Sequence, residues 1–203
     1  MIKIYRNILF ILSSLLLISG IVGRIQRLYI QFYYKVSYKE MSPQLGQEQL
    51  FFEIITVLCL FFSTLAFSIW VHILHKWLRE NFAVSNFLPD WWGIFGFFIP
   101  IANYYYPFAY IYETYEQLYQ INYKKKLKQW SIFKLYIAIL WIALFVSGLL
   151  TIIDYYLLDK LGFSEVKEVD IATSIFLIFQ YSSLLLIMLT LEWHRLKIFK
   201  ERS

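Results

Sequence analysis

The sequence predicts an all-α integral membrane protein, in which four transmembrane helices carry a re-entrant or interfacial helical hairpin between the second and the third. Composition is the first observation: 60% of the 203 residues are hydrophobic and 16% are charged, against roughly 45–50% and 25% in soluble domains. The second is a set of four apolar runs, each close to the roughly 20 residues with which a helix crosses a bilayer. The runs cover residues 8–23, 50–73, 132–153 and 171–191 of what we treat as a single membrane domain, residues 1–203.

The first run follows Lys3 and Arg6, which is also how a secretory signal peptide begins. No convincing small-x-small cleavage site comes after it. We therefore expect an uncleaved helix that stays in the membrane. Gly20 and Gly23 lie three residues apart in this helix, and their spacing favours the close approach of another helix.

Residues 87–122 contain a segment with the length of a span but not its character, because the stretch GFFIPIANYYYPF interrupts it. In a continuous helix, the missing N–H groups of Pro100 and Pro107 would leave the carbonyls of Gly96 and Asn103 without donors. Lipid offers no donor, so protein or trapped water must supply one. We predict a short helix, an elbow around Asn103 and a second helix, which together dip into the membrane and return.

The second helix of this hairpin is expected to run from Pro107 to about residue 120, because proline suits the first turn of a helix. Apolar and aromatic side chains recur along it at helical spacing, opposite a polar face. The apolar face is formed by Phe108, Ile111, Tyr112, Tyr115, Leu118 and Tyr119. The helix is therefore amphipathic, and we expect it to lie at the membrane interface.

A five-span topology is the alternative, in which residues 91–112 cross the membrane. Lysines and arginines divide between the two sides in the same ratio for four and for five spans, so the positive-inside rule does not separate them. The unsatisfied carbonyls and a belt of tryptophans at one interface favour four spans. In this topology both termini are cytoplasmic.

A basic cluster of Lys124, Lys125, Lys126 and Lys128 precedes the third run. Next to a membrane, such a cluster attracts anionic lipid at about 1 kcal/mol per residue. The expected partners are therefore the lipid bilayer and anionic lipid at these lysines, and no nucleic acid. A partner membrane protein or a second copy of the chain is also compatible with the apolar helix faces.

Three motifs follow one another between residues 70 and 118. They are a tryptophan in the second run, a Pro-x-Trp sequence and the stretch GFFIPIANYYYP. This arrangement resembles the bacterial membrane family of domain of unknown function 4328, whose signature is similar to G-W-F-I/V-P-x-x-N-x-x-x-P. The matching positions are Trp70, Pro89, Trp91, Gly96, Phe97, Phe98, Pro100, Asn103 and Pro107. The chain differs in having Phe97 where an indole is usual. The resemblance implies a multi-pass protein of the bacterial inner membrane, and it supplies a fold but no activity.

Four residues have a spacing that would suit a metal site. His72 and His75 lie three apart in the second run, and Glu113 and Glu116 lie three apart on the second hairpin helix. Histidine and carboxylate at one depth are the donors that a zinc-dependent hydrolase needs. However, neither an HExxH pattern nor an evident third ligand is present, and amphipathic residues at a membrane boundary have the same spacing. We therefore expect no cofactor.

Two functions stay open. The first is a non-catalytic module whose cytoplasmic-side hairpin forms a cleft for a lipid, a small apolar ligand or a partner helix. The alternative is a membrane-embedded, metal-dependent hydrolase that uses the His and Glu residues. Gln180, in the middle of the fourth run, is also a functional candidate because polar groups are rare inside membranes, although structural pairing is the simpler interpretation.

Overall fold

The computed structural model describes residues 2–33, 43–82, 92–96, 105–123, 132–160 and 167–200, and the statements below concern these residues. Their regular structure is helical, with no strand among them. The helices are α1 (Ile2–Tyr33), α2 (Pro43–Phe82), α3 (Trp92–Phe95), α4 (Tyr106–Tyr123), α5 (Ile132–Lys160) and α6 (Lys167–Lys200).

Four of these helices are long and apolar enough to span a membrane, and they contain the four predicted runs. The spans cover Tyr5–Tyr29, Ile54–Phe82, Ile132–Leu150 and Ile171–Lys200. The helices extend beyond the apolar runs because helical hydrogen bonding does not stop where hydrophobicity does. For example, α2 begins at Pro43, whose missing N–H is harmless in a first turn, and continues past Lys76 and Arg79. The prediction of four membrane-spanning helices is confirmed.

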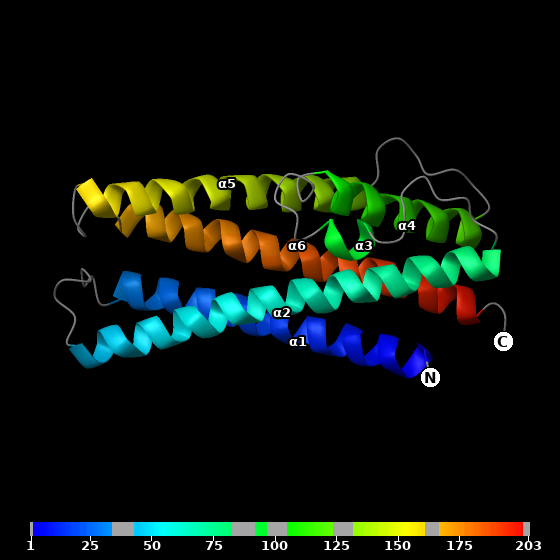
Figure 1. Cartoon of the computed structure of the whole chain (residues 1–203), viewed down its shortest axis with the longest axis horizontal. Coiled ribbons are helices and arrows are strands. Elements are labelled where there is room, and N and C mark those ends of the chain that lie inside the picture. Colours follow the sequence, from blue (N-terminus) through cyan, green and yellow to red (C-terminus); the bar gives the residue numbers. More distant parts are fainter. Residues whose placement is uncertain are drawn as a thin grey trace.

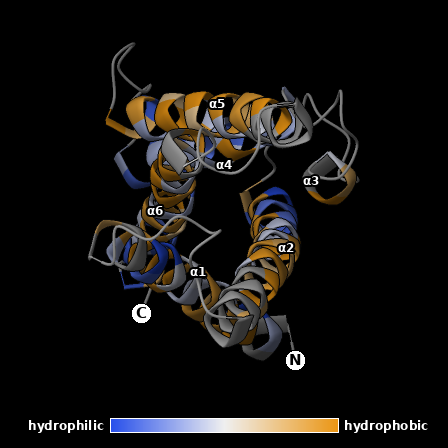
Figure 2. Cartoon of the chain, turned by 90° about the vertical axis from the view of Figure 1, so that its left-hand side faces the viewer, coloured by the Kyte–Doolittle hydropathy of each residue, from blue (hydrophilic) through white to orange (hydrophobic). Residues whose placement is uncertain are grey.

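The four long helices form a bundle in the order α2, α1, α6, α5 (Figures 1 and 2). Helix α1 packs against α2 and α6, and α6 also packs against α5, whereas α2 and α5 are not packed against each other. Both chain termini lie at the same end of the bundle (Figure 1). We call this the terminal end. Helix α4 lies towards it and packs against α6, α2 and α5.

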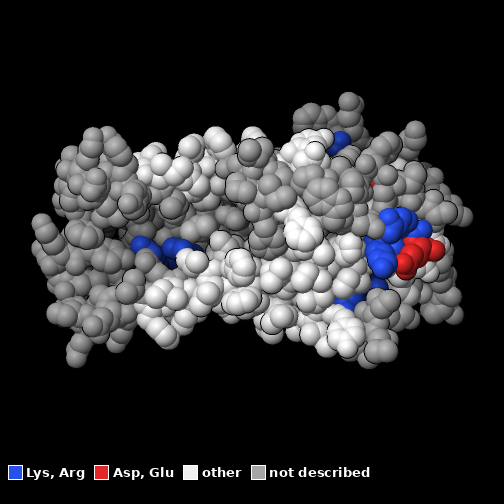
Figure 3. All heavy atoms as spheres, viewed as in Figure 1, with Lys and Arg blue, Asp and Glu red and all other residues white. Residues whose placement is uncertain are grey.

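The outward helix faces carry large apolar side chains, as contact with lipid requires. Leu15, Phe62 and Leu189 are 58%, 50% and 46% exposed, respectively. Charged side chains of the described residues gather mainly at the terminal end in Figure 3, with a smaller basic spot towards the other end. Between them, the described residues visible on this face are uncharged, which suits the hydrocarbon core of a bilayer.

The close helix approach predicted for α1 is confirmed. A Cβ atom added at Gly20 would lie 2.6 Å from Cε1 of Tyr181 on α6, and one added at Gly23 would lie 2.9 Å from Oγ1 of Thr56 on α2. Each glycine therefore faces a different neighbour. Small residues let helices approach closely in this way inside a membrane.

The predicted hairpin is described only in part. Helix α4 begins at Tyr106, one residue before Pro107, and its buried residues are Pro107, Tyr110, Ile111, Thr114, Tyr115 and Leu118. Of the expected first helix, Trp92–Phe95 is helical. Pro89, Trp91, Phe97, Phe98, Pro100, Asn103 and the lysine cluster lie outside the described residues. The elbow and the re-entrant path of the chain therefore remain predictions.

Candidate functional site

A cavity lies on the side of the bundle where α2 and α5 are not packed together. Its volume is about 340 Å³, near the lower end of the roughly 300–1,000 Å³ of ligand pockets. It is bounded by α2, α4, α5 and α6. The lining residues are Val57, Leu60, Phe61, Thr64, Pro107, Phe108, Leu140, Leu144, Gln180 and Leu184.

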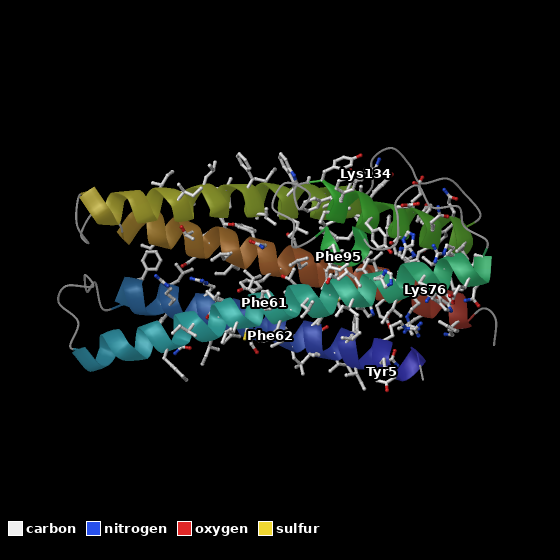
Figure 4. All side chains as sticks on the ribbon, in the orientation of Figure 1. Tyr5, Phe61, Phe62, Lys76, Phe95 and Lys134 are labelled. Atoms are coloured by element: carbon white, nitrogen blue, oxygen red, sulfur yellow. The ribbon has the colours of Figure 1, made fainter. Side chains whose placement is uncertain are left out.

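The walls are mostly apolar, and the residues that α2, α5 and α6 contribute lie within the membrane-spanning parts of these helices. The first turn of α4 contributes Pro107 and Phe108, so the second hairpin helix closes one end of the cavity. Phe61 is 51% exposed and lines the rim. Figure 4 shows Phe61 and its neighbour Phe62 on the same stretch of α2, and their rings lie edge to face with the centroids 5.5 Å apart.

Thr64 and Gln180 are the polar side chains among the lining residues. The Gln180 side chain is buried, and its Oε1 lies 3.4 Å from Oγ of Ser147 on α5. Ser147 shares its one hydroxyl hydrogen between this oxygen and the carbonyl of Leu144, which is 3.1 Å away. The contact between Ser147 and Gln180 joins α5 to α6 within the membrane and uses the oxygen of the amide. It leaves both N–H donors of the Gln180 amide available to the cavity.

A buried hydrogen-bonded chain fixes α4 against α2. Nδ1 of His75 lies 2.9 Å from Oγ1 of Thr114, and Thr114 donates its hydroxyl hydrogen to the carbonyl of Tyr110 at 2.8 Å. Because that hydrogen is already used, Nδ1 of His75 must be the donor to Thr114. The His75 ring also stacks on Tyr110, with the ring centroids 4.3 Å apart. His75 therefore positions the helix that closes the cavity.

Contacts with α6 and α5 hold the rest of α4. Nδ2 of Asn122 donates to the carbonyl of His194 at 2.9 Å. The ring of Tyr115 stacks on that of Phe133, with 3.8 Å between the centroids. Helix α4 is thus attached to three helices of the bundle, and this explains why its buried face includes Tyr110 and Thr114, which the amphipathic pattern did not single out.

The structure does not assemble a metal site from the predicted donors. Nδ1 of His75 is hydrogen-bonded to Thr114, and His72, Glu113 and Glu116 are only partly buried. The part of the chain that is described contains no group of three or more His, Cys, Asp or Glu side chains placed to hold a metal ion.

Sequence analysis missed a buried cluster of charges at the terminal end. Glu192 on α6 is 8% exposed, and both its oxygens accept hydrogen bonds from Arg195, one of them from Nε at 2.7 Å. Arg6 on α1 is 2% exposed, and its Nε finds no acceptor among the described residues. Both guanidinium groups approach the ring of Phe199, at 5.9 Å for Arg6 and 5.3 Å for Arg195. The Glu-x-x-Arg spacing after the fourth run was the available signal.

The described signature residues are all buried. Trp70 is fully buried between Phe10 and Phe67, with centroid distances of 5.7 and 6.1 Å. Gly96 is buried immediately after α3, and Pro107 lines the cavity. Trp70 thus packs α2 against α1, whereas Pro107 shapes the cavity.

Comparison with known families supports the family resemblance that the signature residues carry. The sequence profile of the family described as Domain of unknown function (DUF4328) matches residues 47–192, which is well over half of the chain. Comparisons with curated proteins and with solved structures gave no match. The matched region includes α3, α4 and α5, most of α2 and α6, and all the residues that line the cavity. The chain therefore belongs to the DUF4328 family, and its four long apolar helices identify it as a multi-pass membrane protein.

Proposed function

We propose that the protein is a non-catalytic membrane module that holds a neutral apolar molecule, taken from the bilayer, in the cavity between α2, α4, α5 and α6. The cavity is the observation that carries this proposal. Eight of its ten lining residues are apolar, and none of the ten is charged. A mostly apolar pocket with a few polar groups is the usual form of a small-molecule site.

The position of the cavity favours a ligand that arrives through the membrane. Its walls belong to spans α2, α5 and α6, and the half-exposed Phe61 stands at a rim between helices that are not packed together. A partner helix is a poorer occupant, because a helix with its side chains is about 10–12 Å across. A cavity of about 340 Å³ cannot enclose an object of that width over several turns.

Filling the cavity should remove the bound molecule. We expect Leu144→Trp to reduce the amount of small molecule that co-purifies with the protein by about 10-fold or more, because the indole takes up space that the ligand needs. The measurement is native mass spectrometry of the protein in detergent, followed by solvent extraction. Leu149→Trp on the same helix is the matched control, since Leu149 is 45% exposed and does not line the cavity.

Three outcomes would contradict the proposal. Wild-type protein that carries no small molecule would argue against a ligand site. Equal retention by Leu144→Trp and Leu149→Trp would place the bound molecule on the outer lipid-facing surface instead. Recovery of a stoichiometric second polypeptide in place of a small molecule would favour a partner helix.

The orientation of the protein is part of the same proposal. With both termini in the cytoplasm of a bacterial cell, the lysines at 124–128 meet the inner leaflet of the inner membrane and bind anionic lipid there. The shared position of both termini at one end of the bundle supports an even number of crossings (Figure 1).

Cysteine labelling checks this orientation. In a Cys59→Ser background, single cysteines that replace Asn86 and Lys125 should both react with a membrane-impermeant reagent only from the cytoplasmic side. The two positions flank the hairpin, so a hairpin that returns leaves them on one side. Labelling of position 86 from outside would establish five spans.

A further inference from the structure

The amide of Gln180 is an unusual feature for the wall of an otherwise apolar cavity. Its oxygen accepts the hydrogen bond from Ser147, while its N–H donors are left for whatever occupies the cavity. A buried donor without an acceptor is disfavoured, because its lost hydration is not replaced. An occupant that supplies an acceptor is therefore preferred over one that does not.

The depth of Gln180 restricts what the acceptor can be. Gln180 lies nine residues after Ile171, where the span of α6 begins, which is about 14 Å along the helix at 1.5 Å per residue. Because the hydrocarbon core is about 30 Å thick, the amide is near its middle. The ester carbonyls of a phospholipid that keeps its headgroup at the surface do not reach this depth.

The charge of the lining restricts the ligand further. No cation or anion is present among the residues that line the cavity, and Thr64 is the other polar member. An ionised group would be buried there without a counter-charge, which is strongly unfavourable. The ligand group at Gln180 is therefore neutral.

We infer that the ligand is a neutral apolar molecule with a carbonyl or hydroxyl oxygen, and that the Gln180 amide binds this oxygen near the middle of the membrane. This inference rests on the proposed function, because it uses the same cavity. Ser147 is a positioning residue, since its hydroxyl hydrogen, which it shares with the carbonyl of Leu144, faces the amide oxygen and so directs the N–H groups away from α5.

Three probes of equal chain length test the inference: 2-tridecanone, tridecane and tridecanoate. Each is added to the full chain in detergent, and the retained probe is measured by mass spectrometry after gel filtration. We expect the ketone to be retained about 2- to 10-fold better than the alkane, as one hydrogen bond would give, and better than the carboxylate. In Gln180→Leu the preference for the ketone over the alkane should disappear while the alkane is still retained. Ser147→Ala should reduce this preference, and Ser182→Ala, on a residue that does not line the cavity, should leave it unchanged.

The outcomes separate this inference from the proposed function. Equal retention of ketone and alkane by the wild-type protein would overturn the role of Gln180 and leave the apolar cavity intact as a ligand site. Carboxylate retained as well as the ketone would overturn the requirement for a neutral group. Retention of no probe, together with no co-purified molecule, would overturn both.

Discussion

Glu192→Gln should lower the free energy of unfolding by about 3–5 kcal/mol, the usual effect of removing one partner from a buried ion pair. Glu192 accepts two hydrogen bonds from Arg195, and both residues are buried. Arg6 is close enough for the charges of both Arg195 and Glu192 to act on it. Without the carboxylate, two buried guanidinium groups would repel each other with no counter-charge from the described residues around them.

Unfolding in detergent with increasing sodium dodecyl sulfate measures this effect. Glu80→Gln is the matched control, because it removes the same charge from an exposed position on α2, where substitutions usually change stability by less than about 0.5 kcal/mol. The double variant Glu192→Leu, Arg195→Met should recover part of the loss, since apolar replacement of a whole buried pair is often tolerated. Equal stability of Glu192→Gln and Glu80→Gln would mean that the cluster is hydrated and not buried.

Much of the fold could be predicted from the sequence, because the membrane imposes a simple length requirement. Each of the four predicted runs lies inside a long helix. Helix α4 was expected to begin at Pro107, and it begins one residue earlier, at Tyr106. These features depend on local properties: apolar runs of about 20 residues and the missing N–H of proline. Family membership was predicted from equally local features, a few residues at fixed spacing.

The contacts between helices could not be predicted, because they depend on how each helix is rotated towards its neighbours. The spacing of His72 and His75 predicts that they share one helix face, but it does not predict that Nδ1 of His75 lies 2.9 Å from Oγ1 of Thr114. One residue along a helix turns the side chain by about 100°. Likewise, Glu192 comes directly after the fourth apolar run, and its burial depends on the packing of other helices against α6.

Gly20→Val should also be strongly destabilising, by about 3 kcal/mol, at the upper end of the usual range for overpacking. An added Cβ would lie 2.6, 2.8 and 3.1 Å from three ring atoms of Tyr181. That ring is fully buried, and its hydroxyl donates to the carbonyl of Thr56 at 3.1 Å. Tyr181 is therefore held by α2 at its hydroxyl and cannot move away from α1 without losing a buried hydrogen bond.

Gly148→Ala is the control for the helix itself. A Cβ at Gly148 would meet nothing within 4 Å, so alanine there should be neutral or stabilising by up to about 1 kcal/mol through the lower conformational freedom of the unfolded chain. Alanine at Gly20 also lowers the conformational freedom of the unfolded chain. We therefore expect Gly20→Ala to be less destabilising than Gly20→Val. The stabilities of the Gly20 and Gly148 variants are measured by the same unfolding experiment in detergent with increasing sodium dodecyl sulfate.

A double-mutant cycle shows whether Tyr181 is the cause. In a Tyr181→Leu background the added Cβ no longer meets the ring, so Gly20→Ala should change from destabilising to neutral or stabilising. Contacting residues typically give interaction energies of about 0.5–3 kcal/mol in such a cycle. If Gly20→Ala stabilises the wild-type protein as much as Gly148→Ala does, the Tyr181 ring can move aside at no measurable cost. In that case α1 and α6 would not be as close at Gly20 as the structure places them.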